Sequence, residues 1–121
     1  MKPTILCYPP CSTCRKALKW LDEQGIAYDV RHIVDEKPTV CELEAWSAAY
    51  APGIRKFFNT SGLKYRELKL KERLPLMNDK ELVGLLATDG MLVKRPILVT
   101  PRGVCPGFSA ERWLELLADN A

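Results

Sequence analysis

The sequence predicts an α/β fold, and two observations support this prediction. Residues 4–33 hold an apolar run, an amphipathic helix pattern and a second apolar run, and residues 96–117 hold two short apolar runs and another helix pattern. Strand–helix–strand order predicts a parallel pair with a right-handed crossover, and two closely spaced strands predict an antiparallel hairpin. The segment from about 39 to 90 shows helical patterns alone. We therefore expect a βαβ–ββα frame, a mixed four-stranded sheet and an all-helical insert in one domain of residues 1–121.

The first strand is expected over Thr4–Tyr8, because Pro9-Pro10 ends this apolar run. Helical periodicity follows from Arg15 to Gln24, and Gly25 suits a left-handed stop after it. The inward stripe of this helix, at i, i+3, i+4 and i+7, consists of Cys14, Ala17, Leu18 and Leu21. The second strand is expected over Ile26–Ile33, which completes the βαβ unit.

The insert is expected to contain several short helices. Capping-box patterns at residues 39–42 and 78–81 predict the starts of two of them, and the second ends near Gly90. Between these two, residues 54–58 predict one or two helical turns and residues 64–70 predict a short helix. The residues expected to point inward are Leu43, Trp46, Tyr50, Leu82, Leu85 and Leu86.

The strand pattern returns at residues 96–100. After a turn at Pro101-Arg102-Gly103, a shorter strand is expected over Val104–Phe108. Ser109 is a favourable N-cap residue for the last helix. Its inward face consists of Trp113, Leu116 and Leu117.

Cys11 and Cys14 form a CxxC motif where the first strand meets the first helix. The first turn of a helix has unpaired N–H groups and the positive end of the dipole, which favour an anion such as a thiolate, the reactive form of cysteine. Cys11 precedes the inward stripe and Cys14 lies on it. We therefore expect an exposed nucleophile at Cys11 and a more buried resolving thiol at Cys14, for which a purely structural core cysteine is the alternative.

Three neighbours of the motif are candidates for binding an anionic substrate group. Ser12 and Thr13 offer hydroxyl and N–H groups, with simple N-terminal capping as the alternative. A positive charge is unfavourable in a first helical turn. Arg15 is therefore either a solvated surface charge or a guanidinium that holds a thiolate or an acidic substrate group.

The number and spacing of the cysteines predict neither a disulfide framework nor a metal site. Five is an odd number of cysteines, and the single CxxC lacks the second ligand pair of a typical zinc site, so no metal is expected. Cys7 falls in a strand and Cys41 in a helix, so we expect both to be buried. Cys105, in the last strand, is expected to be structural.

Charge and hydropathy argue against nucleic acid and membranes as binding partners. The net charge is +3, and no concentrated basic stripe predicts direct binding to nucleic acid. No apolar stretch approaches the roughly 18 residues needed to span a bilayer. The start of the sequence lacks the pattern of a secretory signal. We therefore expect a cytoplasmic protein without a membrane partner.

Several segments together resemble one known family. They are the Cys11–Ala17 stretch (CSTCRKA), the Phe58–Gly62 turn, the Tyr65–Leu68 segment after it, and the Lys94–Val99 segment (KRPILV). In combination they are similar to the arsenate reductase/Spx/MgsR (ArsC) family, and the resemblance covers nearly the whole chain. A lone CxxC is weak evidence, whereas CxxCRKA followed some eighty residues later by KRPI is specific.

The resemblance implies a thioredoxin-like fold with Cys11 at the catalytic thiol position. It also implies that Arg95 lies near the active site and that the Arg95–Pro96 bond is cis, which is physically reasonable because only X–Pro bonds adopt cis at low cost. Arg95 and Pro96 therefore join Ser12, Thr13 and Arg15 as candidate substrate-binding residues.

The sequence also departs from the family's arsenate reductases. The glutaredoxin-coupled enzymes use three arginines around the oxyanion, and only Arg95 has a matching position here. Residues 59–61 (Asn-Thr-Ser) and 104–108 contain no arginine. A doubly charged oxyanion beside a thiolate needs paired guanidinium groups. Those enzymes also have no cysteine at the place of Cys14.

The sequence therefore predicts a thiol–disulfide oxidoreductase with no bound cofactor. Glutathione, or a thioredoxin or glutaredoxin system, is the expected external reductant and partner. One alternative is an Spx-like redox-sensing regulator that binds RNA polymerase. A glutaredoxin-coupled arsenate reductase is the third hypothesis.

Overall fold

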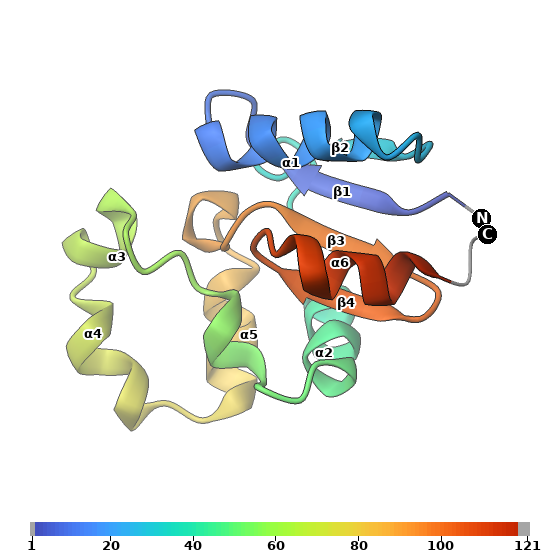
Figure 1. Cartoon of the computed structure of the whole chain (residues 1–121). Coiled ribbons are helices and arrows are strands. Elements are labelled where there is room, and N and C mark those ends of the chain that lie inside the picture. The colour runs from blue at the N-terminus through green and yellow to red at the C-terminus, as the bar shows by residue number, and fades with distance from the viewer. Residues whose placement is uncertain (1, 119–121) are drawn as a thin grey trace. The chain divides into compact units, whose positions relative to one another are not determined.

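The computed structural model describes residues 2–118 of the chain (Figure 1). This part of the chain forms two compact units. One unit is built from the chain up to His32 and from Arg95 onward, and the other, a helical unit, spans Ile33–Lys94. The helical unit is wider at both ends than the insert predicted at residues 39–90.

The first unit contains the mixed four-stranded sheet, in the order β2-β1-β3-β4. Its strands are β1 (Thr4–Cys7), β2 (Asp29–His32), β3 (Ile97–Thr100) and β4 (Gly103–Pro106). β1 pairs with β2 in parallel, while β1 with β3 and β3 with β4 are antiparallel. The predicted parallel pair and C-terminal hairpin are both confirmed, and so is the thioredoxin-like βαβ–ββα order.

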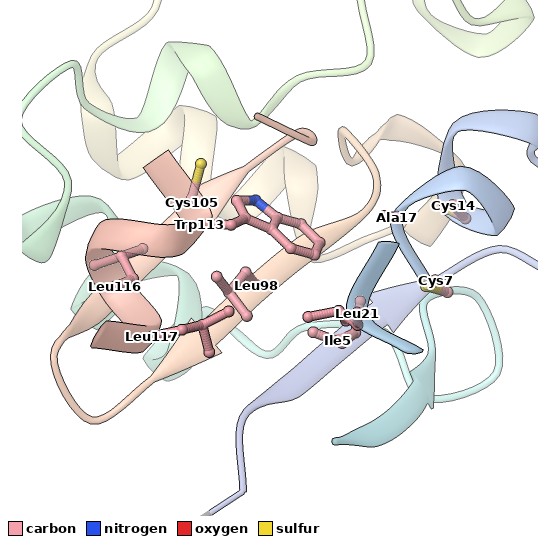
Figure 2. Packing of buried hydrophobic residues seen from close by; sticks show 10 residues of the cluster. All are labelled: Ile5, Cys7, Cys14, Ala17, Leu21, Leu98, Cys105, Trp113, Leu116 and Leu117. Atoms are coloured by element: carbon pink, nitrogen blue, oxygen red, sulfur yellow. The ribbon is translucent and has the colours of Figure 1, made fainter. Parts of the chain in front are cut away.

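Two helices, α1 (Ser12–Glu23) and α6 (Ala110–Leu117), pack on one face of this sheet. Register places Ile5, Leu98 and Cys105 side by side on the three strands β1, β3 and β4, and all three are buried. Figure 2 shows the cluster that they form with both helices. Its other members are Cys7, Cys14, Ala17, Leu21, Trp113, Leu116 and Leu117. The predicted inward faces of both helices are thus confirmed, except that Leu18 is only partly buried.

Two strand boundaries in this unit differ from the predicted ones by two residues or more, and backbone hydrogen bonds explain both of them. The Ile26 N–H bonds the Leu21 carbonyl at 3.1 Å, so Ile26 belongs to the end of α1 and β2 starts only at Asp29. β4 ends at Pro106 because Gly107 has φ +82° and donates its N–H to the Pro96 carbonyl at 2.7 Å. α1 starts at Ser12 with Cys11 as its N-cap residue, so the predicted position of Cys11 at the start of the helix is confirmed.

The helical unit contains four α-helices and three 3-10 segments within the described residues. The α-helices are α2 (Val40–Ala49), α3 (Leu63–Glu67), α4 (Leu70–Arg73) and α5 (Asp79–Leu86). The 3-10 segments are η1 (Ile54–Phe57), η2 (Leu74–Leu76) and η3 (Gly90–Leu92). Capping boxes start α2 at Thr39 and α5 at Asn78, as predicted.

Three expectations for the helical unit are wrong, and one of them is the end of α5, which lies at Leu86 rather than near Gly90. The single helix predicted at residues 64–70 is divided into α3 and α4, because Lys69 adopts a left-handed conformation with φ +52°. Cys41 is exposed rather than buried. The inward stripe of α2 passes through Leu43 and Trp46, and a residue two positions before Leu43 lies on another side of the helix.

Candidate functional site

A tight turn between β1 and α1 positions the CxxC motif. Pro9-Pro10 occupies the two central positions of this turn, and the Cys11 N–H bonds the Tyr8 carbonyl at 2.9 Å. Cys11 is the N-cap residue of α1, with extended backbone angles (φ −74°, ψ 122°), and its carbonyl accepts the Arg15 N–H at 3.2 Å. The motif therefore begins at the first residue of the helix cap.

The two thiols of the motif differ in exposure as predicted. Cys11 is only partly buried, at the edge of the cluster, whereas Cys14 is 1% exposed and packs on the same side of α1 as Ala17 and Leu21. A substrate can therefore reach Cys11 more easily than Cys14.

Four groups act on the Cys14 sulfur and hold its pKa at about 6. The largest effect is a hydrogen bond with the Cys7 thiol, and the next lowering effect is the Tyr8 N–H, which donates to Cys14 Sγ at 3.4 Å. A hydrogen bond with the Cys11 thiol and the charge of Arg95 also lower the pKa, while burial opposes them by raising it. Hydrogen bonds to the charged form favour ionisation, so Cys14 is the thiol held as a thiolate at neutral pH.

The Cys7 thiol is affected in the opposite direction. Its pKa is raised, first by the hydrogen bond with Cys14 and then by burial. Cys7 is 3% exposed and ends β1, so its burial is as predicted. The pKa values of Cys7 and Cys14 are therefore shifted in opposite directions by their interaction.

The sequence predicted that the backbone amides at the start of the helix stabilise the sulfur of Cys11. The structure does not show this interaction. In the described part of the chain, the Cys11 side chain makes no capping hydrogen bond with the first turn of α1. The amide that bonds a sulfur is instead the N–H of Tyr8, in the turn before the helix, and it bonds Cys14.

Arg95 lies near these sulfurs, as the resemblance implied, and the Arg95–Pro96 bond is cis. Its guanidinium carbon lies 4.9 Å from the centre of the Tyr8 ring, within the range of a cation–π contact. Nη1 of Arg95 is buried and has no hydrogen-bond partner among residues 2–118. A buried, unpaired donor of this kind is able to donate a hydrogen bond to an anionic or carbonyl oxygen.

The remaining predicted site residues are placed as follows. Ser12, Thr13 and Arg15 are exposed in the first turn of α1, next to the two thiols in sequence. Pro96 is buried, and its carbonyl accepts the Gly107 N–H. The roles of these residues in binding substrate stay predictions.

Sequence reasoning missed the parts played by Cys7 and Tyr8. It identified Cys7 only as a buried cysteine and Tyr8 only as the end of a strand. The available signal was the position of both residues at the end of the strand that leads into the CxxC helix. In a β-turn-α unit, that strand end lies under the first helical turn.

Other parts of the molecule offer less chemistry. A cavity of about 360 Å³ in the helical unit is lined by Glu44, Ser47, Asp79, Lys80 and Val83, from α2 and α5. Among the described residues, no three or more His, Cys, Asp or Glu side chains are grouped so that they could hold a metal ion. No helix in residues 2–118 has the length and apolarity needed to cross a membrane.

Comparison with known proteins gives consistent matches across the chain. The model of the ArsC family matches residues 6–116. The uncharacterised protein YusI of Bacillus subtilis is 46% identical to this chain over 95% of the chain and 98% of YusI. The regulatory protein MgsR of B. subtilis is 31% identical, over 93% of this chain and 88% of MgsR.

Two further matches bear on activity and fold. An arsenate reductase of Rhizobium meliloti is 31% identical, over 99% of this chain and 84% of that protein. The crystal structure of a putative ArsC family related protein from Bacteroides fragilis superposes with a TM-score of 0.93 and 54% identity, covering 96% of this chain and 98% of the other.

Proposed function

The chain belongs to the ArsC family, and on that premise we propose that it is a thiol–disulfide oxidoreductase with Cys11 and Cys14 as its redox pair. One observation carries the proposal. The partly exposed Cys11, the N-cap residue of α1, lies three residues before the buried Cys14, whose sulfur accepts the Tyr8 N–H and has a pKa lowered to about 6. A reachable thiol beside a sulfur that accepts its proton is the arrangement that disulfide exchange requires.

In the first step, Cys11 attacks a substrate disulfide, R–S–S–R′. The Cys11 proton passes to the Cys14 thiolate as the new S–S bond forms, and R′–S⁻ leaves and takes up a proton from solvent. The product is a mixed disulfide between Cys11 and R. Cys11 makes this attack because Cys14, at 1% exposure, is not accessible to a substrate.

In the second step, Cys14 resolves the mixed disulfide. The Tyr8 N–H and the Cys7 thiol favour the return of Cys14 to the thiolate, which attacks Cys11 Sγ and releases R–S⁻. The substrate disulfide has then gained two electrons, and the protein holds a Cys11–Cys14 disulfide. Glutathione, or a thioredoxin or glutaredoxin system in a reducing compartment such as the cytoplasm, returns the two electrons.

Arg95 is proposed to bind an acidic substrate group. Its unpaired Nη1 and its charge near Cys14 support a contact with a carboxylate or an oxyanion close to the reacting sulfurs. Ser12, Thr13 and Arg15 are proposed to contribute from the exposed first turn of α1. Pro96 would shape the site through its backbone.

The experiment is a turnover assay with a small mixed disulfide and glutathione, recycled by glutathione reductase and NADPH, with a parallel arm that uses thioredoxin and its reductase. Catalysed NADPH oxidation is expected, and C11S should reduce it to the uncatalysed rate. C14S should accumulate a mixed disulfide on Cys11, which is visible by mass spectrometry. C41S is the matched control, because Cys41 is exposed and lies in the helical unit. Full turnover by C11S would disprove the proposal.

A regulator that binds RNA polymerase, with the CxxC as its redox switch, is a second candidate. The observation that favours it is the 31% identity to the regulatory protein MgsR. Reduced and oxidised protein would be tested for retention of purified RNA polymerase. Retention that depends on the redox state, without turnover in the assay above, would favour the regulator over the enzyme.

Arsenate reduction is a third candidate, favoured by the identity to the Rhizobium meliloti enzyme. Arg95 is the one arginine whose charge is found to act on Cys14 among the described residues, which is little for a doubly charged oxyanion. Turnover with arsenate, glutathione and glutaredoxin would establish this activity.

A further inference from the structure

We infer that Tyr8 is a positioning residue for Arg95, and that its ring holds the guanidinium so that Nη1 donates to a carboxylate of the substrate. The inference rests on the proposed function, because it assigns a further residue and a substrate group to the same site. The contact between the two side chains is a feature of the structure and needs no assumption about turnover.

The sheet brings Tyr8 and Arg95 together from distant parts of the sequence. β1 and β3 are antiparallel, and at this end of the pair Leu6 lies opposite Ile97. Continuing the same register by two residues places Tyr8 opposite Arg95, just outside both strands. The position of the contact therefore follows from the pairing of the two strands.

The contact has the geometry of a cation–π interaction. The guanidinium carbon of Arg95 lies over the Tyr8 ring, 4.9 Å from its centre, which is inside the limit of roughly 6 Å for such contacts. Both side chains are half-buried, so water and salt screen the attraction less than at an exposed site. The ring also makes a T-shaped contact with His32 of β2, with 6.0 Å between the ring centres, which restricts its movement. The ring is therefore a fixed surface against which the guanidinium lies.

Within the described residues, the Arg95 guanidinium has one buried nitrogen that makes no hydrogen bond, Nη1. A buried donor without a partner costs free energy, so an anion that accepts from Nη1 removes this cost and gains a charge-assisted bond. The backbone N–H of Tyr8 donates to Cys14 Sγ at 3.4 Å, so the residue that holds Arg95 also contacts the redox pair. One guanidinium matches the single charge of a carboxylate, such as those of glutathione.

The side chain and the backbone of Tyr8 act on different partners, which makes the inference testable. The N–H that bonds Cys14 belongs to the backbone and is kept by every substitution except proline. A change of the ring therefore alters the contact with Arg95 and leaves the donor to the sulfur in place. Tyr50 is a matched control, because it is also half-buried and makes a T-shaped contact, with Phe57 at 5.6 Å, inside the helical unit.

The experiment is an NMR titration of the reduced, isotope-labelled full-length protein with S-methylglutathione, which has carboxylates and no thiol that could react. The side-chain Nε–H signal of Arg95 is identified as the arginine signal that is absent in R95Q. Y8F, Y8L and Y50L are compared with R95Q and with the double variant Y8L/R95Q. Thermal unfolding is recorded for each variant, and Y8M replaces Y8L if Y8L does not fold.

In the wild-type protein, the ring current of Tyr8 should shift the Nε–H signal of Arg95 upfield. Y8F keeps the ring, so it should keep both this shift and the affinity for the probe. Y8L should lose the shift and weaken binding by about threefold to tenfold, while Y50L should change neither. In Y8L/R95Q the binding should be as weak as in R95Q alone, because Tyr8 acts through Arg95.

Four results would overturn the inference. The first is an Nε–H signal of Arg95 that does not move in Y8L, and the second is an equal loss of affinity in Y8F and Y8L, which would assign the effect to the hydroxyl group. The third is a loss caused by Y8L that is undiminished in the R95Q background, which would mean that Tyr8 acts independently of Arg95. The fourth is a wild-type protein that does not bind the probe. Because neither measurement needs turnover, a failed turnover assay rejects the proposed function alone, and a failed titration rejects the inference alone.

Discussion

The start of α1 and the starts of α2 and α5 are built from different residues. Thr39 and Asn78 accept the N–H groups of Glu42 and Glu81 at 3.1 and 2.8 Å, and both glutamates bond back to the cap N–H at 3.0 Å. α1 begins with Cys11, which makes no side-chain capping bond, and its first turn contains no acidic residue.

The starts of α2 and α5 therefore contribute to stability, whereas the start of α1 contains the proposed redox pair. A capping box satisfies two backbone donors of the helix start, and an N-cap side chain contributes about 1 kcal/mol to stability. α1 lacks that contribution and has at the same position a thiol that contacts Cys14. The start of α1 therefore gives up local stability at the place where the redox pair lies.

The pH dependence of stability is the largest effect expected from this arrangement. The pKa of Cys14 lies near 6, below the ordinary value of about 8.5, so its contribution is complete above 8.5 and is lost as the pH falls through 6. The free energy of unfolding of the reduced protein should thus rise between pH 6 and 8, by up to about 1.4 kcal/mol per pH unit. Urea unfolding with reductant at several pH values measures it.

C14A is the reference for that measurement, because it removes the titrating group and keeps the acidic caps of α2 and α5. The reduced wild-type protein should gain more stability from pH 6 to 8 than C14A does. The raised pKa of Cys7 acts in the opposite direction, since its contribution is present below about 8.5 and is lost above that pH. Parallel curves for the two proteins would show that Cys14 is not held as a thiolate.

The capped helices provide the next largest effect. T39A and N78A should each lower the free energy of unfolding by about 1 kcal/mol, because each removes the acceptor for an N–H of the first turn. Denaturant unfolding at one pH measures the loss, and T60A, at an exposed turn residue, is the control. The Cys14 titration should not change in either variant. A change in the pKa of Cys14 in either cap variant would remove the distinction between the two kinds of helix start.

The fold was largely predictable because its signals are local or periodic. Short apolar runs predicted the strands, helical apolar patterns predicted the helices, and the residues of two capping boxes predicted the starts of α2 and α5. The errors have local causes that pattern does not contain. Lys69 takes a left-handed conformation that sequence rarely indicates for lysine, and Cys41 lies in α2 but outside its inward stripe.

The candidate site was predicted less completely, because its interactions join residues from three segments. The CxxC motif indicated Cys11 and Cys14, and the resemblance to the family indicated Arg95. The hydrogen bond from the Tyr8 N–H to Cys14 and the effect of Cys7 on the pKa of Cys14 depend on how the end of β1 meets the first turn of α1. Spacing along the chain shows which residues are adjacent to a helix start, but not which sulfur their donors reach.

A smaller effect is expected for the cap position itself. C11S places a stronger acceptor at the N-cap of α1, so it should raise the free energy of unfolding by a few tenths to about 1 kcal/mol, although it removes the proposed nucleophile. The comparison is made below pH 5, where Cys14 is protonated in both proteins. C41S, the same change inside α2, should have almost no effect. An unchanged or lower stability for C11S would mean that α1 gives up nothing by starting with cysteine.

The smallest expected effect is that of removing the positive charge of Arg95. Among the groups that lower the pKa of Cys14, Arg95 has the weakest influence, since it acts by charge without a hydrogen bond to the sulfur. R95Q should therefore raise the pKa of Cys14, measured by thiolate absorbance at 240 nm, by less than C7A does. R15Q is the matched control, because Arg15 is exposed in the first turn of α1, where water screens its charge. A shift in R95Q larger than that in C7A would show that charge, rather than the donors at the end of β1, holds Cys14 as a thiolate.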